Sequence, residues 1–134
     1  MTESDIFVFV YGTLKRNCRA NGLLKNSFYL GEYVTLPKYE LYSCLTFPAL
    51  VKAVSVPQKI RGEVYKITTA TRKLLDQYEG TDYGLYCFDQ IELEINEDDS
   101  HFVGSRKIYA YFYQGNIENW EKIDNWTCYK ENLV

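Results

Sequence analysis

The stretch IFVFVYGTLK, residues 6–15, decides the fold expected for this chain. Its first half is a continuous apolar run, which is typical of a strand buried on both faces in the middle of a sheet. We therefore expect residues 6–10 to form a central strand. The run ends at Gly12, where a glycine would allow a turn with positive φ or a close approach of bare backbone to a ligand.

Further strands are indicated by aromatic and β-branched stretches along most of the chain. These stretches predict strands at residues 28–35, 39–42, 49–56, 60–67, 86–95 and 107–113. The polar segment NEDDS, residues 96–100, predicts a hairpin loop. The tail from Ile117 holds both tryptophans and is expected to pack against the domain.

One helix is predicted in TTATRKLLDQYEG, residues 68–80. Thr68 or Thr69 is suited to cap its start, and Gly80 to adopt a left-handed conformation at its end. Leu74, Leu75 and Tyr78 form an apolar stripe at helical spacing, which we expect to be mostly buried. A mixed sheet with one main helix places the protein in the α+β class.

The length of 134 residues indicates one globular domain over residues 1–134, and a hydrophobic content of 46% is ordinary for such a domain. A net charge of -3 argues against a nucleic-acid partner, which would require a basic surface. The N-terminus shows no signal-peptide pattern, and no apolar stretch approaches the ~20 residues that span a bilayer. We therefore expect no membrane partner. The oligomeric state stays open.

The cysteines carry no recognisable metal or disulfide pattern. Cys18, Cys44, Cys87 and Cys128 are far apart in the sequence, and His101 is the single histidine. Zinc sites usually bring pairs of such ligands together at short spacing. We expect four free thiols, no bound metal and a cytoplasmic location, because reduced thiols are typical of that compartment.

The loop after the first strand is the first candidate for a site, with the sequence Tyr11-Gly12-Thr13-Leu14. Consecutive N–H groups that leave a strand ladder form a small nest that binds anions, and a carboxylate would suit it. The alternative is a tight turn whose N–H groups are satisfied by the protein itself. Lys15 and Arg16 follow, either as further anion ligands or as solvated loop charges.

The second candidate is Glu79 at the end of the predicted helix. A carboxylate there faces the negative end of the helix dipole, which favours its neutral form and raises its pKa. A general base that works near neutral pH needs such a shift. Asp76 lies one turn earlier and is the competing choice, and either residue could be an ordinary surface acid.

Together these motifs resemble the γ-glutamyl cyclotransferase-like family, and among its members the γ-glutamylamine cyclotransferases. The resemblance rests on a strand followed by YGTLK, a later G-E-V-Y strand, and a helix that ends in L-D-x-x-E-G with a tyrosine soon after. A W-x-x-Y pattern follows near the C-terminus. The matching segments are residues 11–15, 62–65, 75–80, Tyr86 and 126–129.

The resemblance implies a mixed β-barrel-like core with a pocket at the end of the first strand. It assigns substrate binding to the loop and to Tyr86, and acid/base catalysis to Glu79, with no metal or cofactor. The implied reaction is a lyase-type intramolecular aminoacyl transfer. The α-amine of a γ-glutamyl group attacks its own γ-carbonyl, which releases 5-oxoproline and an amine.

Two stretches depart from the family's pattern. Phe88 stands where an arginine often follows the tyrosine, and residues 16–21 lack the usual glycine and proline after YGTLK. Both departures concern the substrate more than the fold. The alternative function is a binding module that uses the same pocket for a small anionic metabolite or a protein partner without turnover. A retained Glu79 favours the enzyme, since a binder gains nothing from an unpaired acid facing a ligand carboxylate.

Overall fold

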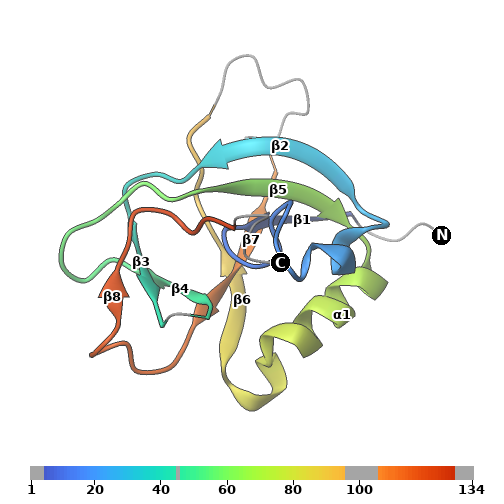
Figure 1. Ribbon diagram of the computed structural model, residues 1–134. Helices are drawn as coiled ribbons and strands as arrows, with labels where there is room; N and C mark the ends of the chain where they lie inside the picture. Colours follow the sequence, from blue (N-terminus) through green and yellow to red (C-terminus); the bar gives the residue numbers. More distant parts are fainter. Residues whose placement is uncertain (1–4, 45, 96–105, 129–134) are drawn as a thin grey trace.

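The structure, a computed structural model, describes residues 5–44, 46–95 and 106–128. Within these residues, eight strands, one α-helix and two short 3₁₀ helices follow one another (Figure 1). In chain order they are β1 (Ile6–Val10), η1 (Asn21–Leu24), β2 (Phe28–Val34), β3 (Tyr39–Ser43), β4 (Pro48–Lys52), β5 (Arg61–Ile67), α1 (Thr69–Glu79), η2 (Thr81–Tyr83), β6 (Tyr86–Gln90), β7 (Ile108–Tyr113) and β8 (Glu121–Lys122). The predicted hairpin loop at residues 96–100 lies outside the described residues.

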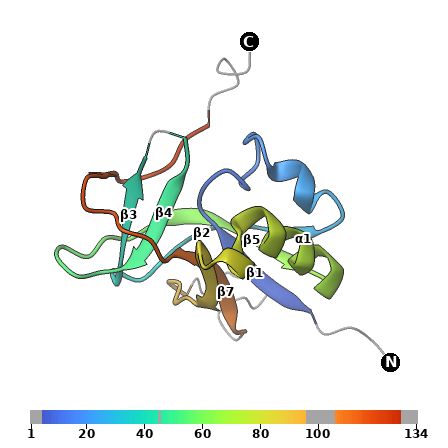
Figure 2. The same ribbon diagram turned by 90° about the horizontal axis from the view of Figure 1, so that it is seen from below.

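The strands form two sheets around a shared core. The larger sheet has the order β2-β5-β1-β7-β6, and the smaller has the order β4-β3-β8. β1 pairs antiparallel with β5 and parallel with β7, so the larger sheet is mixed. Figures 1 and 2 show α1 and the smaller sheet on opposite sides of the molecule. The α+β class and the barrel-like curl are confirmed, although the described strands make two curled sheets and no closed barrel.

β1 is the central strand of the larger sheet, as its apolar run predicts. Successive side chains of a strand point to opposite faces. Phe7 and Phe9 accordingly pack into one core cluster, against β3 and β4, while Val8 and Val10 pack into the other, beneath α1. A strand that is buried on both faces has no place for a polar residue, which explains the unbroken run.

The helix begins and ends where the sequence predicts, but it buries a different face. The Thr68 side chain accepts a hydrogen bond from the Thr71 N–H, and Gly80 ends the helix with φ 70°. Leu75 is fully buried, whereas Leu74 and Tyr78 are 48% and 41% exposed, so their predicted burial is wrong. The inward stripe runs through Thr71 and Leu75 at a spacing of four residues. Its next member is Glu79.

Two further expectations need correction. The predicted strand at residues 86–95 ends at Gln90; beyond it Leu93 makes only an isolated bridge to Thr35, and Ile95 is 76% exposed. The predicted strand at residues 49–56 ends at Lys52. Short-range alternation is present in both segments, but beyond Gln90 and Lys52 the pairing continues as separate backbone hydrogen bonds. The Glu94 N–H donates to the Val34 carbonyl, and the Ala53 N–H donates to the Lys38 carbonyl. No helix among the described residues is long and apolar enough to cross a membrane.

The expectation of four free thiols is wrong for one pair. Cys18 and Cys128 form a disulfide across 110 residues of sequence, while Cys44 and Cys87 are free. The fold brings the segment after β8 against the loop after β1, a contact that no local spacing signals. The thiol argument for a cytoplasmic location therefore fails for this pair, and the location stays a prediction.

Candidate active site

A pocket of about 180 Å³ opens where the end of β1 meets the end of α1. Its remaining walls come from the start of β4, the start of β6, β7 and Arg19 in the loop after β1. The lining residues are Phe9, Val10, Tyr11, Gly12, Thr13, Leu14, Arg19, Phe47, Pro48, Tyr78, Glu79, Leu85, Tyr86 and Tyr111. The wall is mostly apolar and carries a few polar groups, as small-molecule sites usually do.

The loop at residues 11–14 is held in place by its carbonyl groups. The carbonyl oxygen of Gly12 accepts from the Lys15 N–H at 3.0 Å, and that of Thr13 accepts from the Ala20 N–H at 3.0 Å. The Leu14 carbonyl accepts from the Asn21 side-chain amide at 2.8 Å. The three carbonyl oxygens therefore accept hydrogen bonds from the residues that follow the loop.

Gly12 is required by a neighbouring side chain. It does not have a positive φ, contrary to one of the two expected reasons for a glycine here. An added Cβ would lie 2.4 Å from Cγ of Pro48, a distance that no real contact allows. The close approach is therefore to the first residue of β4, and it joins the loop to the smaller sheet.

The tyrosine hydroxyls of the pocket are already engaged by the protein. Tyr11 donates to the Tyr111 carbonyl at 2.6 Å, and Tyr86 donates to the Pro48 carbonyl at 2.8 Å. Burial is the main cause that raises the pKa of both phenols above its ordinary value, so both stay protonated. Tyr11 and Tyr86 thus shape the wall with their rings.

Glu79 lies in this wall, half-buried, as the last residue of α1. Burial raises the pKa of its carboxyl group to about 8, because an apolar surrounding disfavours the charged form. In the described part of the chain, no salt bridge or side-chain hydrogen bond compensates for this burial. An uncompensated carboxyl group with a pKa near neutrality is suited to accept and return a proton.

Asp76 is half-buried as well, but it is committed to structural contacts. Its Oδ1 accepts from the Tyr111 hydroxyl at 2.7 Å, and its Oδ2 lies 3.5 Å from Nε of Arg72. It does not line the pocket. Both carboxylate oxygens of Asp76 therefore have protein partners.

The six residues to which the family resemblance assigns substrate binding or catalysis line one pocket: Tyr11, Gly12, Thr13, Leu14, Glu79 and Tyr86. Lys15 and Arg16 do not line it. Sequence reasoning missed Arg19, Phe47, Pro48 and Tyr111, which reach the pocket from separate elements. Strand pairing places Phe47, Pro48 and Tyr111 there, whereas Arg19 belongs to the loop after β1 and is positioned by the hydrogen bond from the Ala20 N–H to the Thr13 carbonyl.

Comparison with known proteins identifies the family of this chain and several relatives. Residues 8–129 match the family described as Gamma-glutamyl cyclotransferase, AIG2-like. A Vibrio cholerae protein named "Putative gamma-glutamylcyclotransferase" is 39% identical over 72 residues, which are 54% of this chain and 60% of that protein. The family protein ytfP of Citrobacter rodentium is 36% identical over 69 residues, 52% of this chain and 57% of that protein. The aligned regions thus span less than two thirds of either relative.

Solved structures share the fold at low identity. A mouse AIG2-like protein superposes with a TM-score of 0.72 at 19% identity, covering 92% of this chain and 88% of the mouse chain. A structure titled "Gamma-glutamyl cyclotransferase" superposes with a TM-score of 0.60 at 14% identity, covering 89% and 70% of the two chains. With the match over residues 8–129, this chain belongs to the γ-glutamyl cyclotransferase, AIG2-like family.

Proposed function

We propose that this protein is a γ-glutamyl cyclotransferase that converts a γ-glutamyl amine or peptide into 5-oxoproline and a free amine. The observation that supports this most is Glu79, a half-buried carboxyl group in the pocket with its pKa raised to about 8. Family membership supports the reaction class. No cofactor takes part in the proposed reaction.

The loop at residues 11–14 would hold the glutamyl group. Its carbonyl oxygens are committed to Lys15, Ala20 and Asn21, and its N–H groups are the proposed donors to the α-carboxylate. Leu14 and Tyr86 would press against the methylene chain, since both side chains are buried in the wall. Held bent in this way, the α-amine lies close to its own γ-carbonyl, and that proximity lowers the barrier to ring closure.

Glu79 would move one proton in two steps. As a carboxylate it takes a proton from the α-amine while the nitrogen attacks the γ-carbonyl carbon and a carbon–nitrogen bond forms. As a carboxylic acid it returns the proton to the leaving nitrogen while the original amide bond breaks. Electrons and protons balance: one amide is exchanged for another, and Glu79 is regenerated.

The test is an assay of 5-oxoproline release from a panel of γ-glutamyl amines and γ-glutamyl peptides. Turnover of at least one member, and its loss in Glu79→Gln, would support the proposal. Binding of panel members without any turnover would contradict it and would favour the binding module.

A further inference from the structure

The pocket holds one cation and one acid among the residues that the structure describes. Arg19 is the cation, exposed at the edge of the pocket, and Glu79 is the acid in its wall. Because its pKa is about 8, Glu79 is mostly neutral at pH 7. With Glu79 protonated, the side chains that line the pocket carry the positive charge of Arg19, which favours an anionic ligand.

Arg19 also holds most of the hydrogen-bond donors left among the lining side chains. The hydroxyls of Tyr11, Tyr86 and Tyr111 all donate to protein acceptors. Thr13 and Tyr78 share one hydrogen bond between them, which leaves a single neutral hydroxyl hydrogen. A guanidinium has five N–H donors, and Arg19 spends one of them on the Thr46 carbonyl at 2.8 Å.

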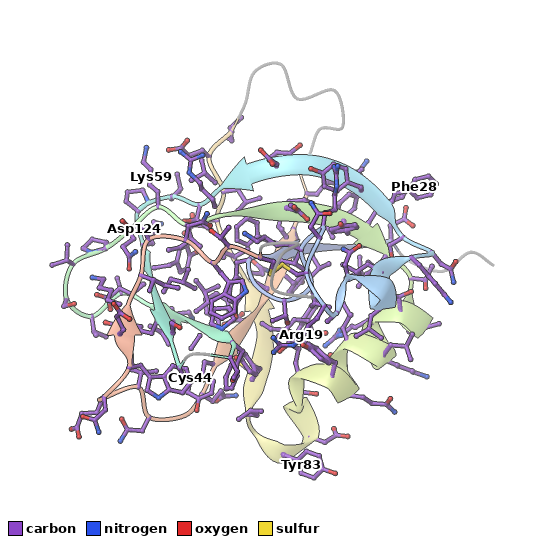
Figure 3. All side chains as sticks on the ribbon, viewed as in Figure 1. Arg19, Phe28, Cys44, Lys59, Tyr83 and Asp124 are labelled. Carbon is purple, nitrogen blue, oxygen red and sulfur yellow. A yellow bond between two sulfur atoms is a disulfide. The ribbon has the colours of Figure 1, made fainter. Side chains whose placement is uncertain are left out.

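The backbone of Arg19 is fixed on both sides. Cys18 precedes it and is tied by the disulfide to Cys128, and Ala20 follows and donates to the Thr13 carbonyl at 3.0 Å. Figure 3 places Arg19 between β6 and α1 in that view, near the ends of the elements that line the pocket. A guanidinium on such an anchored backbone is suited to a specific, bidentate contact with a carboxylate.

The size of the pocket decides which part of a substrate reaches Arg19. A volume of about 180 Å³ is small against the roughly 300–1,000 Å³ of sites for drug-sized ligands. The glutamyl unit carries the reacting atoms, so it must occupy the interior beside Glu79. The group bonded to the γ-carbonyl then extends toward the opening, where Arg19 is exposed.

We infer that Arg19 is a specificity residue that binds a carboxylate on the amine to be released. The preferred substrates are then γ-glutamyl amino acids and peptides whose leaving unit carries a carboxylate near the scissile bond. γ-Glutamyl amines without that carboxylate are poorer substrates. This inference rests on the proposed function, and it adds the chemical class of the leaving group.

The test compares two substrates that differ only in the carboxylate, γ-glutamylalanine and γ-glutamylethylamide. We expect wild-type kcat/KM to be higher for γ-glutamylalanine. Arg19→Ala lowers that value about 10-fold or more, because a charge-assisted contact is lost, and changes the value for the ethylamide less than about 3-fold. Arg19→Lys retains part of the preference, since the charge stays while the bidentate geometry is lost.

The control variant is Arg16→Ala. It removes the same charge from the same loop, but Arg16 stacks over Tyr29 outside the pocket. It should leave the ratio of the two kcat/KM values unchanged. An equal loss on both substrates in Arg19→Ala, or no loss, overturns the inference, because a general loosening of the loop would affect both alike.

Calorimetric binding of the same two compounds separates this inference from the proposed function. If neither compound is turned over, the proposed function fails for this substrate class. The ratio of their Kd values in wild type and in Arg19→Ala still decides the role of Arg19. A ratio that Arg19→Ala leaves unchanged rules that role out.

Discussion

The hydroxyl oxygens of Thr13 and Tyr78 lie 2.7 Å apart and share a hydrogen bond. Thr13 belongs to the loop after β1, and Tyr78 directly precedes Glu79 in the last turn of α1. The contact joins the proposed binding loop to the helix end that carries the proposed acid/base residue. It also explains why Tyr78, although 41% exposed, lines the pocket rather than the core.

Replacing Gly12 should disturb the loop through Pro48. In Gly12→Ala the new Cβ would lie 2.4 Å from a proline ring that has little freedom to move, so the backbone of the loop must shift. We expect a loss of about 1–3 kcal/mol in the free energy of unfolding, typical of overpacking, and weaker substrate binding. Urea unfolding and the KM for the best panel substrate measure the two effects.

Gly22→Ala is the matched control for this prediction. Gly22 lies in η1, has no positive φ, and an added Cβ would meet nothing within 4 Å. Its stability should stay within about 0.5 kcal/mol of wild type. If Gly12→Ala and Gly22→Ala had the same free energy of unfolding, Pro48 would not constrain the loop.

The disulfide between Cys18 and Cys128 should stabilise the protein by restricting the unfolded chain. A bridge across 110 residues closes a long loop, for which a contribution of about 2–4 kcal/mol is typical. Reductant should therefore lower the urea midpoint of wild type. It should not change the midpoint of the Cys18→Ser/Cys128→Ser variant, whereas Cys44→Ser/Cys87→Ser should respond as wild type does.

Alkylation followed by mass measurement checks the same pairing directly. Without reductant, two cysteines should react under denaturing conditions, and with reductant all four. Labelling of all four cysteines without reductant would contradict the bridge.

The sequence was most informative where a pattern is enforced by local geometry. The apolar run of β1 correctly predicts a strand that is buried on both faces. Thr68 and Gly80 correctly predict the two ends of the helix, because capping depends on neighbouring residues. The helix face was predicted less well. Leu74 and Leu75 are adjacent apolar residues, and only the packing of α1 on the larger sheet turns Leu75 inward.

The distant contacts could not be read from the sequence. Pro48 and Tyr111 reach the pocket from β4 and β7, and Cys18 meets Cys128 through the segment that follows β8. These contacts depend on strand order, which the residue pattern does not determine. The family motifs led to Glu79, while the structure adds the apolar environment that raises its pKa.

The pH dependence of turnover should report the pKa of Glu79. The proposed base is the carboxylate, and burial raises its pKa in the free enzyme to about 8. We expect kcat/KM to rise with pH up to about 8, where the carboxyl group loses its proton, and to level off above that value. A limb near 4.5, the ordinary value for this group, would mean that Glu79 is solvated.

Stability gives a second readout that needs no substrate. The folded-state pKa of Glu79 is above its unfolded value, so the folded state favours the protonated form, and stability falls as pH rises from about 4.5 to about 8. Glu79→Gln removes this dependence. The difference in free energy of unfolding between Glu79→Gln and wild type should therefore favour the variant more at pH 9 than at pH 5. Urea unfolding at both pH values measures this difference.

Glu79→Gln should separate catalysis from binding. The amide keeps the shape of the side chain but accepts no proton from the substrate amine, so 5-oxoproline release should fall about 100-fold or more. Binding should persist, because the loop at residues 11–14 is the proposed holder of the glutamyl group. Asp76→Asn is the matched control: it changes a carboxylate one turn earlier that contacts Tyr111 and Arg72 and does not itself line the pocket. It should reduce stability and leave most of the turnover. If Asp76→Asn abolished turnover while Glu79→Gln retained it, the acid/base role would belong to Asp76.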